Sequence, residues 1–143
     1  MVHVYIASGW WQPGHKQALE ILELWLQEQK VGFFSPRLVH LCPPDASDRE
    51  RKAAFDGNLR AIENANLVFA RVDDYDPGTV WEMGYAFGRT PVVAWSLVPM
   101  RKLNLMLAHA CQGYVNGWKQ IQSFFRDGKI NMEVAGKWQE EIE

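Results

Sequence analysis

The sequence predicts an α/β fold in which a parallel five-stranded sheet is covered by helices on both faces. Short apolar runs alternate with longer amphipathic segments, as in parallel sheets joined by right-handed helical crossovers. The length of 143 residues suffices for one hydrophobic core but not for two. We therefore expect one domain over residues 1–143, a three-layer sandwich of flavodoxin-like or Rossmann-like architecture.

Strands are expected where apolar runs are short and bounded by glycine, proline or polar residues. These runs are residues 2–7, 33–35, 67–72, 91–95 and 113–115. Helices are expected where apolar residues recur every three or four positions, at residues 15–30, 48–64, 103–108, 118–127 and 134–141. One more helix is expected to begin at Thr79, with a buried side formed by Val80, Met83, Ala86 and Phe87. Residues 36–47 contain three prolines and are expected to be irregular.

Composition and charge exclude several classes of protein. A formal net charge of −2 and the lack of any basic run give no electrostatic footprint for nucleic acid. No apolar segment is long enough to cross a membrane, and the first residues lack the features of a signal peptide. Cys42 and Cys111 stand far apart and are expected to be reduced thiols. We expect a cytoplasmic protein whose histidines hold no metal, because they lack ligand spacing.

Two acids stand close together after the third expected strand. The turn Asp76-Pro77-Gly78 precedes Glu82, which falls about three positions into the following helix. In open α/β sheets, ligands bind beyond the carboxyl ends of the strands, where both acids are expected. Glu82 also fits a capping box begun by Thr79, and Asp76 also fits a plain turn residue, so the pattern leaves both alternatives open. Asp73 and Asp74 are expected to be solvated loop acids.

The segment from Asp76 to Ala86 reads D-x-G-T-x-x-E-M-G-Y-A and resembles the signature of the nucleoside 2-deoxyribosyltransferase family. The resemblance implies that Glu82 is the nucleophile that takes up the deoxyribosyl group, that Asp76 contacts the sugar and that Gly78 lies at the substrate. A carboxylate suits this chemistry, because it can form a covalent glycosyl ester at the anomeric carbon. We expect Glu82 to stay ionised, because a helix N-terminus favours negative charge.

The first expected strand and its following loop, Tyr5-Ile6-Ala7-Ser8-Gly9-Trp10, also resemble the family. The resemblance implies that the Tyr5 hydroxyl steadies the nucleophile, whereas the strand pattern alone equally suits a core tyrosine. Trp10 or Trp11 would stack on the nucleobase, although a tryptophan pair in a loop also suits a subunit contact. Hydrogen bonds near the base are expected from Ser8, Gly9 and Gln12.

Two asparagines extend the resemblance. Asn58 stands where the family often has aspartate or asparagine turned toward the base, and an asparagine cannot titrate. Asn104-Leu105-Met106 resembles a family segment that reaches into a neighbouring subunit's site, where the asparagine holds the 5′-hydroxyl of the sugar. The resemblance therefore implies a homo-oligomer with shared active sites and makes Asn104 and Met106 substrate-binding residues. An ordinary amphipathic turn is the alternative.

These observations predict an enzyme that moves a 2-deoxyribosyl group between nucleobases through a covalent ester on Glu82, with net retention. Its partners would be a small deoxynucleoside and a nucleobase, and no metal or organic cofactor is expected. A first alternative keeps the nucleophile but ends in water, as a 2′-deoxynucleoside 5′-monophosphate N-glycosidase, which the uncharged loop of residues 8–12 disfavours. A second alternative is a non-catalytic nucleotide-binding module, which only Asn58 favours.

Overall fold

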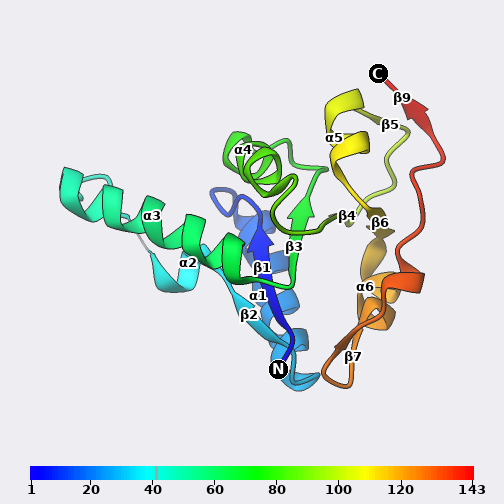
Figure 1. Cartoon of the computed structure of the whole chain (residues 1–143), viewed down its shortest axis with the longest axis horizontal. Coiled ribbons are helices and arrows are strands. Elements are labelled where there is room, and N and C mark those ends of the chain that lie inside the picture. Colours follow the sequence, from blue (N-terminus) through cyan, green and yellow to red (C-terminus); the bar gives the residue numbers. More distant parts are fainter. Residues whose placement is uncertain (41) are drawn as a thin grey trace.

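The computed structural model describes residues 1–40 and 42–143 and has the predicted α/β architecture (Figure 1). Five strands form one parallel sheet in the order β2-β1-β3-β4-β6. They are β1 (His3–Ala7), β2 (Gly32–Phe34), β3 (Leu67–Arg71), β4 (Val92–Ser96) and β6 (Gly113–Asn116). The helices are α1 (Pro13–Glu28), α2 (Pro36–Val39), α3 (Asp48–Asn64), α4 (Pro77–Ala86), α5 (Leu105–Ala110) and α6 (Gly117–Phe124). The prediction of a parallel five-stranded sheet is confirmed.

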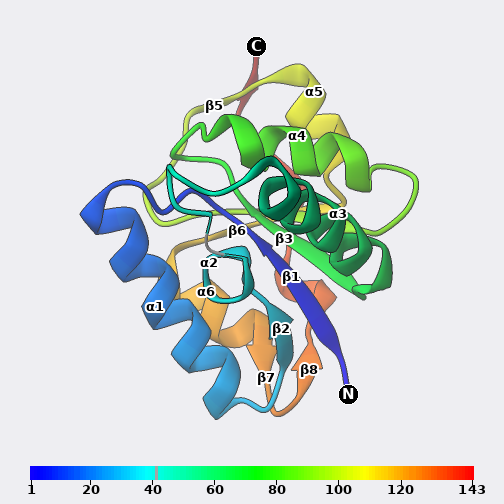
Figure 2. The same ribbon diagram turned by 90° about the vertical axis from the view of Figure 1, so that its left-hand side faces the viewer.

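Different helices pack against the two faces of the sheet. Side chains alternate along each strand, so Val4 and Ile6 of β1 join the core that contains α1 and α6. Tyr5 and Ala7 join the opposite core, to which α3, α4 and α5 contribute. Figure 2 shows α1 and α6 on one side of the sheet and α3, α4 and α5 on the other. This alternation directs Tyr5 toward the helix that carries Glu82.

The direction in which the chain adds strands to the sheet reverses after β2, so β3 lies on the other side of β1. From β1 the chain first moves outward to β2 and then returns to add β3 on the other side of β1. The loops that leave the carboxyl ends of β1 and β3 therefore diverge, and a crevice opens between them, which is the usual ligand position in such sheets. Residues 8–12 and 72–76 form these two loops.

The segments 36–47 and 134–141 have structures other than the predicted ones. Residues 36–47 were expected to be irregular, but Pro36 begins the one-turn helix α2, because proline at a first helical position needs no N–H donor. Residue 41 of that segment lies outside the described residues. The predicted helix over residues 134–141 is wrong, because this segment pairs with distant strands. The backbone N–H of Tyr114 donates to the carbonyl of Gly136 at 2.8 Å.

The C-terminal residues complete a small ladder beside α5. β9 (Glu141–Ile142) pairs in parallel with β5 (Lys102–Leu103), after the 3-10 helix η1 (Met132–Val134). A separate hairpin joins β7 (Phe125–Arg126) to β8 (Lys129–Ile130) and ends α6 earlier than the sequence predicted. Figure 1 shows β9 running past β5 and the start of α5, so the chain end lies next to the segment that contains Asn104.

Candidate active site

Helix α4 begins one turn earlier than predicted, and Asp76 is its N-cap. Asp76 Oδ2 accepts hydrogen bonds from the backbone N–H of Thr79 at 2.9 Å and from the Thr79 hydroxyl at 3.0 Å. The predicted cap at Thr79 is therefore wrong, and Glu82 stands at the sixth helical position rather than about the third. Thr79 and Glu82 do not form the capping box that was the alternative for Glu82, because the Thr79 hydroxyl bonds to Asp76.

The buried side of α4 also differs from the prediction. Met83 and Ala86 are fully buried, as expected, but Val80 and Phe87 are exposed. The helix packs against the sheet through one narrow stripe, since the neighbouring faces border open cavities. Its two exposed sides are therefore available to ligands or to other chains.

Tyr5 and Glu82 meet beneath the first of these cavities. The Tyr5 hydroxyl donates a hydrogen bond to Glu82 Oε2, across from β1 to α4. Burial raises the pKa of the Glu82 carboxyl to about 7; the Tyr5 hydrogen bond opposes this rise, and the charge of Asp76 adds to it. The expectation that Glu82 stays ionised is corrected, because the loss of hydration outweighs the helix N-terminus at this depth. Burial, followed by the charge of Glu82, raises the pKa of Tyr5 as well.

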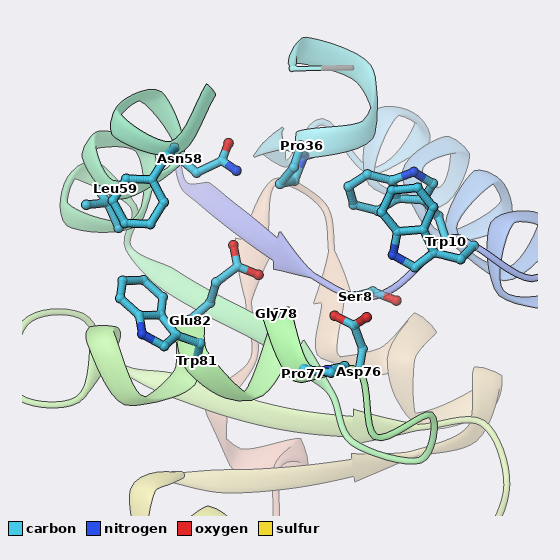
Figure 3. A pocket seen from close by; sticks show the side chains of 12 residues that line it. Ser8, Trp10, Pro36, Asn58, Leu59, Asp76, Pro77, Gly78, Trp81 and Glu82 are labelled. Carbon is cyan, nitrogen blue, oxygen red and sulfur yellow. The ribbon is translucent and has the colours of Figure 1, made fainter. Parts of the chain in front are cut away.

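The cavity above Glu82 has a volume of about 580 Å³ and brings most of the predicted site residues together. Side chains from the β1–α1 loop, α3 and the start of α4 line it (Figure 3). The predicted residues among them are Ser8, Trp10, Trp11, Asn58, Asp76, Gly78 and Glu82. Residues that the sequence analysis did not single out are Pro36, Phe55, Leu59, Pro77 and Trp81. The predicted β1–α1 and β3–α4 segments thus converge on one site.

Aromatic rings stand on both sides of the cavity. Trp10 and Trp11 stack on each other, with ring centroids 5.2 Å apart. Phe55 and Trp81 lie 5.5 Å apart with their ring planes 50° to each other. Figure 3 shows Trp10 and Trp81 on opposite sides of the Glu82 carboxylate. The cavity therefore offers aromatic surfaces on two sides to a flat, apolar ring.

Asn58 contributes an amide to the same cavity. Its Oδ1 atom is buried and has no hydrogen-bond partner among the described residues, and Figure 3 shows the amide directed into the cavity. A buried polar atom without a partner is costly, so a ligand that bonds to this amide would recover free energy. Phe55, Asn58 and Leu59 stand three and four residues apart, which places them on one side of α3. This helical spacing was the sequence signal that could have identified the α3 side of the cavity.

Asn104 and Met106 lie elsewhere. Asn104 is the N-cap of α5, where its Oδ1 accepts a hydrogen bond from the backbone N–H of Met106 at 2.9 Å. Neither residue lines the cavity above Glu82. Met106 instead lines a second cavity of about 640 Å³ between α4 and α5, on the other side of α4. Within one chain, the structure does not bring these two predicted residues to the others.

The expectation that Asp73 and Asp74 are solvated is wrong. Their side chains are only 3% and 1% exposed. Asp73 accepts hydrogen bonds from Arg71 Nε at 2.6 Å and from the backbone N–H of Leu97 at 2.9 Å. Burial works against the charge, but these hydrogen bonds and the charge of Arg71 lower the pKa of Asp73 overall, whereas burial raises the pKa of Asp74. Asp73 therefore ties the β3–α4 loop to the end of β4.

The described residues contain neither a cluster of metal-binding side chains nor a membrane-spanning helix. No cluster of three or more histidine, cysteine, aspartate or glutamate side chains in residues 1–40 and 42–143 is arranged to hold a metal ion. No helix in the same residues combines the length and apolar character needed to span a membrane.

Solved structures share the fold. A 2-deoxyribosyltransferase from Bacillus psychrosaccharolyticus superposes with a TM-score of 0.80 at 24% identity, over 96% of this chain and 100% of that one. A conserved protein from Enterococcus faecalis gives a TM-score of 0.56 at 17% identity, over 93% of each chain. A CMP N-glycosidase from Clostridium botulinum gives 0.53 at 18% identity, over 80% of this chain and 88% of that one. No curated protein sequence matches significantly.

The family assignment depends on a match to the sequence itself. The model of the nucleoside 2-deoxyribosyltransferase family matches residues 4–132. This span begins in β1, includes every residue that lines the cavity above Glu82, and reaches the first residue of η1. The chain belongs to the nucleoside 2-deoxyribosyltransferase family.

Proposed function

We propose that this protein transfers a 2-deoxyribosyl group from one nucleobase to another through a covalent ester on Glu82, with net retention. The single observation that carries the proposal is the Glu82 carboxyl at the base of an aromatic-walled cavity, hydrogen-bonded by Tyr5. A carboxylate in such a site can displace a base from the anomeric carbon, and burial of the reacting groups strengthens the electrostatic stabilisation of the developing charge.

The reaction has two displacements. Glu82 Oε attacks the anomeric carbon, the N-glycosidic bond breaks, and the base leaves with the bonding electron pair and takes a proton from solvent. A second base then attacks the same carbon, releases the Glu82 carboxylate and loses a proton to solvent. Two inversions at one carbon give net retention. Asn58 binds the base but exchanges no proton, because an amide does not titrate in this range.

Asp76 would bind the sugar. Its Oδ2 already accepts two hydrogen bonds from Thr79, which fixes the carboxylate in the cavity wall and leaves Oδ1 for a sugar hydroxyl. This geometry supports a role for Asp76 in positioning the sugar.

A nucleoside fits the cavity better than a nucleotide. Among the described residues that line it, the charged side chains are Asp76 and Glu82, and neither lysine nor arginine is present. Two carboxylates would repel a 5′-phosphate. Lys102 does not line the cavity and lies 3.6 Å from Glu141 in the β5–β9 ladder. The cavity therefore favours an uncharged deoxynucleoside.

A hydrolase is the second candidate, and the fold shared with the Clostridium botulinum CMP N-glycosidase is the observation that favours it. In that reaction water, rather than a second base, would release the sugar from Glu82. The carboxylate-lined cavity makes a phosphorylated substrate less favourable here, but it does not exclude attack by water on the ester. The two outcomes differ in their products, which makes them separable.

One assay tests both candidates. Deoxyinosine or thymidine is incubated with and without adenine, and deoxyadenosine and free deoxyribose are followed by chromatography. Deoxyadenosine supports the transferase, whereas free deoxyribose without exchange supports the hydrolase. Glu82→Gln, which keeps the shape of the side chain, should abolish both. Binding by the wild type with no cleavage under any condition would instead indicate a non-catalytic binding protein.

The oligomer is part of the same proposal. Met106 is 73% exposed and Phe87 is 64% exposed, and both line the apolar groove between α4 and α5. A groove of this kind is typical of a surface that another chain covers. We expect a second copy to pack there, so that its Asn104 reaches the sugar bound above Glu82 of the first copy.

A further inference from the structure

Large apolar side chains form the α3–α4 side of the active-site cavity. Phe55 and Trp81 form this side, and they remain 49% and 50% exposed. Exposed aromatic side chains at the edge of a cavity lose water-contacting surface when a ligand covers them, which favours binding. Trp10 and Trp11 already offer a stacking surface on the opposite side. The wall formed by Phe55 and Trp81 therefore offers an apolar surface to a second group of the ligand.

Trp81 is held in place from behind. Its ring stacks on Tyr85 at 5.5 Å with an angle of 7° between the planes. The Arg89 guanidinium lies 4.4 Å from the Tyr85 ring centroid, and the Tyr85 hydroxyl donates to Glu63 on α3. Trp81 and Tyr85 are i, i+4 neighbours on α4, and Arg89, after the end of the helix, covers Tyr85, so these contacts fix the orientation of Trp81 beside the cavity. A wall that is rigid before binding loses little conformational entropy when a ligand arrives.

The wall is adjacent to the amide that faces the base. Phe55 precedes Asn58 by one helical turn on α3, so both side chains project to the same side of the helix. A base that hydrogen-bonds to Asn58 presents its amino or carbonyl edge to that amide. Any substituent on the exocyclic nitrogen of this edge would lie against Phe55 and Trp81.

We propose that Phe55 and Trp81 form a subsite for a planar apolar substituent on the exocyclic amine of the nucleobase. This inference rests on the proposed function and narrows its substrate class to N-substituted aminopurines and aminopyrimidines. The enzyme uses such bases as acceptors in preference to unsubstituted ones. Trp81 and Phe55 are thus specificity-determining residues that take no part in bond making.

The test compares adenine with N6-benzyladenine as acceptors from deoxyinosine. The wild type should give a higher kcat/KM for N6-benzyladenine, and Trp81→Ala should lower the ratio of the two values by about 10-fold, in keeping with the loss of one aromatic contact. The kcat/KM for adenine should fall by less than the kcat/KM for N6-benzyladenine, because adenine lacks the substituent that contacts this wall. Trp81→Phe, which keeps a ring at this position, is the matched control and should retain most of the preference. Phe55→Ala against Phe55→Leu gives an independent pair.

Equilibrium dialysis of the two bases, without a sugar donor, separates this inference from the transferase proposal. Tighter binding of N6-benzyladenine that depends on Trp81, in a protein that exchanges no base, supports the subsite and overturns the transferase. Exchange with adenine together with an unchanged ratio in Trp81→Ala overturns the subsite alone. A change in oligomeric state in Trp81→Ala with an unchanged ratio also overturns it, because the wall would then be a subunit contact.

Discussion

Gly9 and Asp76 approach so closely that a Cβ atom on Gly9 would lie 3.0 Å from Asp76 Oδ1. Asp76 cannot give way without cost, because its other oxygen caps α4. We predict that Gly9→Ala displaces Asp76 or the β1–α1 loop, lowers kcat/KM for base exchange by about 10-fold or more, and destabilises the fold by about 1 kcal/mol. Steady-state kinetics and denaturant unfolding measure the two effects.

Gly14→Ala is the control for this prediction. Gly14 lies in the first turn of α1, and nothing lies within 4 Å of an added Cβ there. Alanine should therefore be neutral or stabilise the helix by about 0.5 kcal/mol, with unchanged activity. Equal losses of activity in the two variants would show that the contact with Asp76 is not the cause.

The pKa of about 7 for Glu82 sets the pH dependence of the reaction. Only the ionised carboxylate is a nucleophile, so kcat/KM should rise about tenfold per pH unit below 7 and level off above it. The Tyr5 hydrogen bond lowers this pKa, so Tyr5→Phe should move the midpoint to higher pH. A pH–rate profile with a deoxynucleoside that does not titrate in this range gives the midpoint.

Tyr114→Phe is a matched control for Tyr5→Phe. The Tyr114 hydroxyl on the edge strand β6 bonds with Ser96 of β4, and Tyr114 does not line the cavity above Glu82. Its removal should leave the midpoint where it is in the wild type. A midpoint that moves to lower pH in Tyr5→Phe, or that moves equally in both variants, contradicts the assigned role of the Tyr5 hydrogen bond.

Local signals were sufficient to predict the sheet and the longest helices. The α3 bounds match residues 48–64 because Ser47 and Glu50 form a capping box at the start, and Asn64 is followed by an extended residue. Each strand of the five-stranded sheet lies within one residue of its predicted ends, because buried parallel strands are short continuous apolar runs. Tyr5, Asp76 and Glu82 were predicted to act together because the segments that contain them resemble motifs of the family, which the strand and helix patterns alone did not imply.

Features set by long-range contacts could not be predicted in this way. Asp73 was expected to be a solvated acid in a loop. Its burial depends on backbone donors from Leu97 and Val98, more than 20 residues away. The segment around Gly136 has no apolar stripe that fixes its structure, and pairing with Tyr114 keeps it extended. Glu82 was expected to be ionised from its helical position alone, whereas burial by its surroundings determines its pKa.

The raised pKa of Glu82 also predicts a pH-dependent stability. Below pH 4.5 the carboxyl is protonated in both folded and unfolded states; between pH 4.5 and about 7 it ionises first in the unfolded state, so stability falls as pH rises. The loss is complete above pH 7 and amounts to at most about 3 kcal/mol. Glu82→Gln removes this titration, so it should be more stable than the wild type at pH 8 and similar at pH 4.5. Denaturant unfolding at the two pH values tests this, and an equal difference at both would contradict it.

Shared active sites predict complementation between two inactive variants. Glu82→Ala lacks the nucleophile and Asn104→Ala lacks the proposed contact with the sugar from the neighbouring copy, so each homo-oligomer should be nearly inactive. In a two-fold dimer formed from an equal mixture, half of the dimers are mixed and each has one intact site, which restores about a quarter of the wild-type activity. Phe87→Glu places a charge in the apolar groove between α4 and α5 and should dissociate the oligomer. Base-exchange assays on the mixture of Glu82→Ala and Asn104→Ala measure complementation. Light scattering on Phe87→Glu measures the loss of the oligomer. A mixture as inactive as its components, or a Phe87→Glu protein that is monomeric and fully active, would show that each chain holds a complete site.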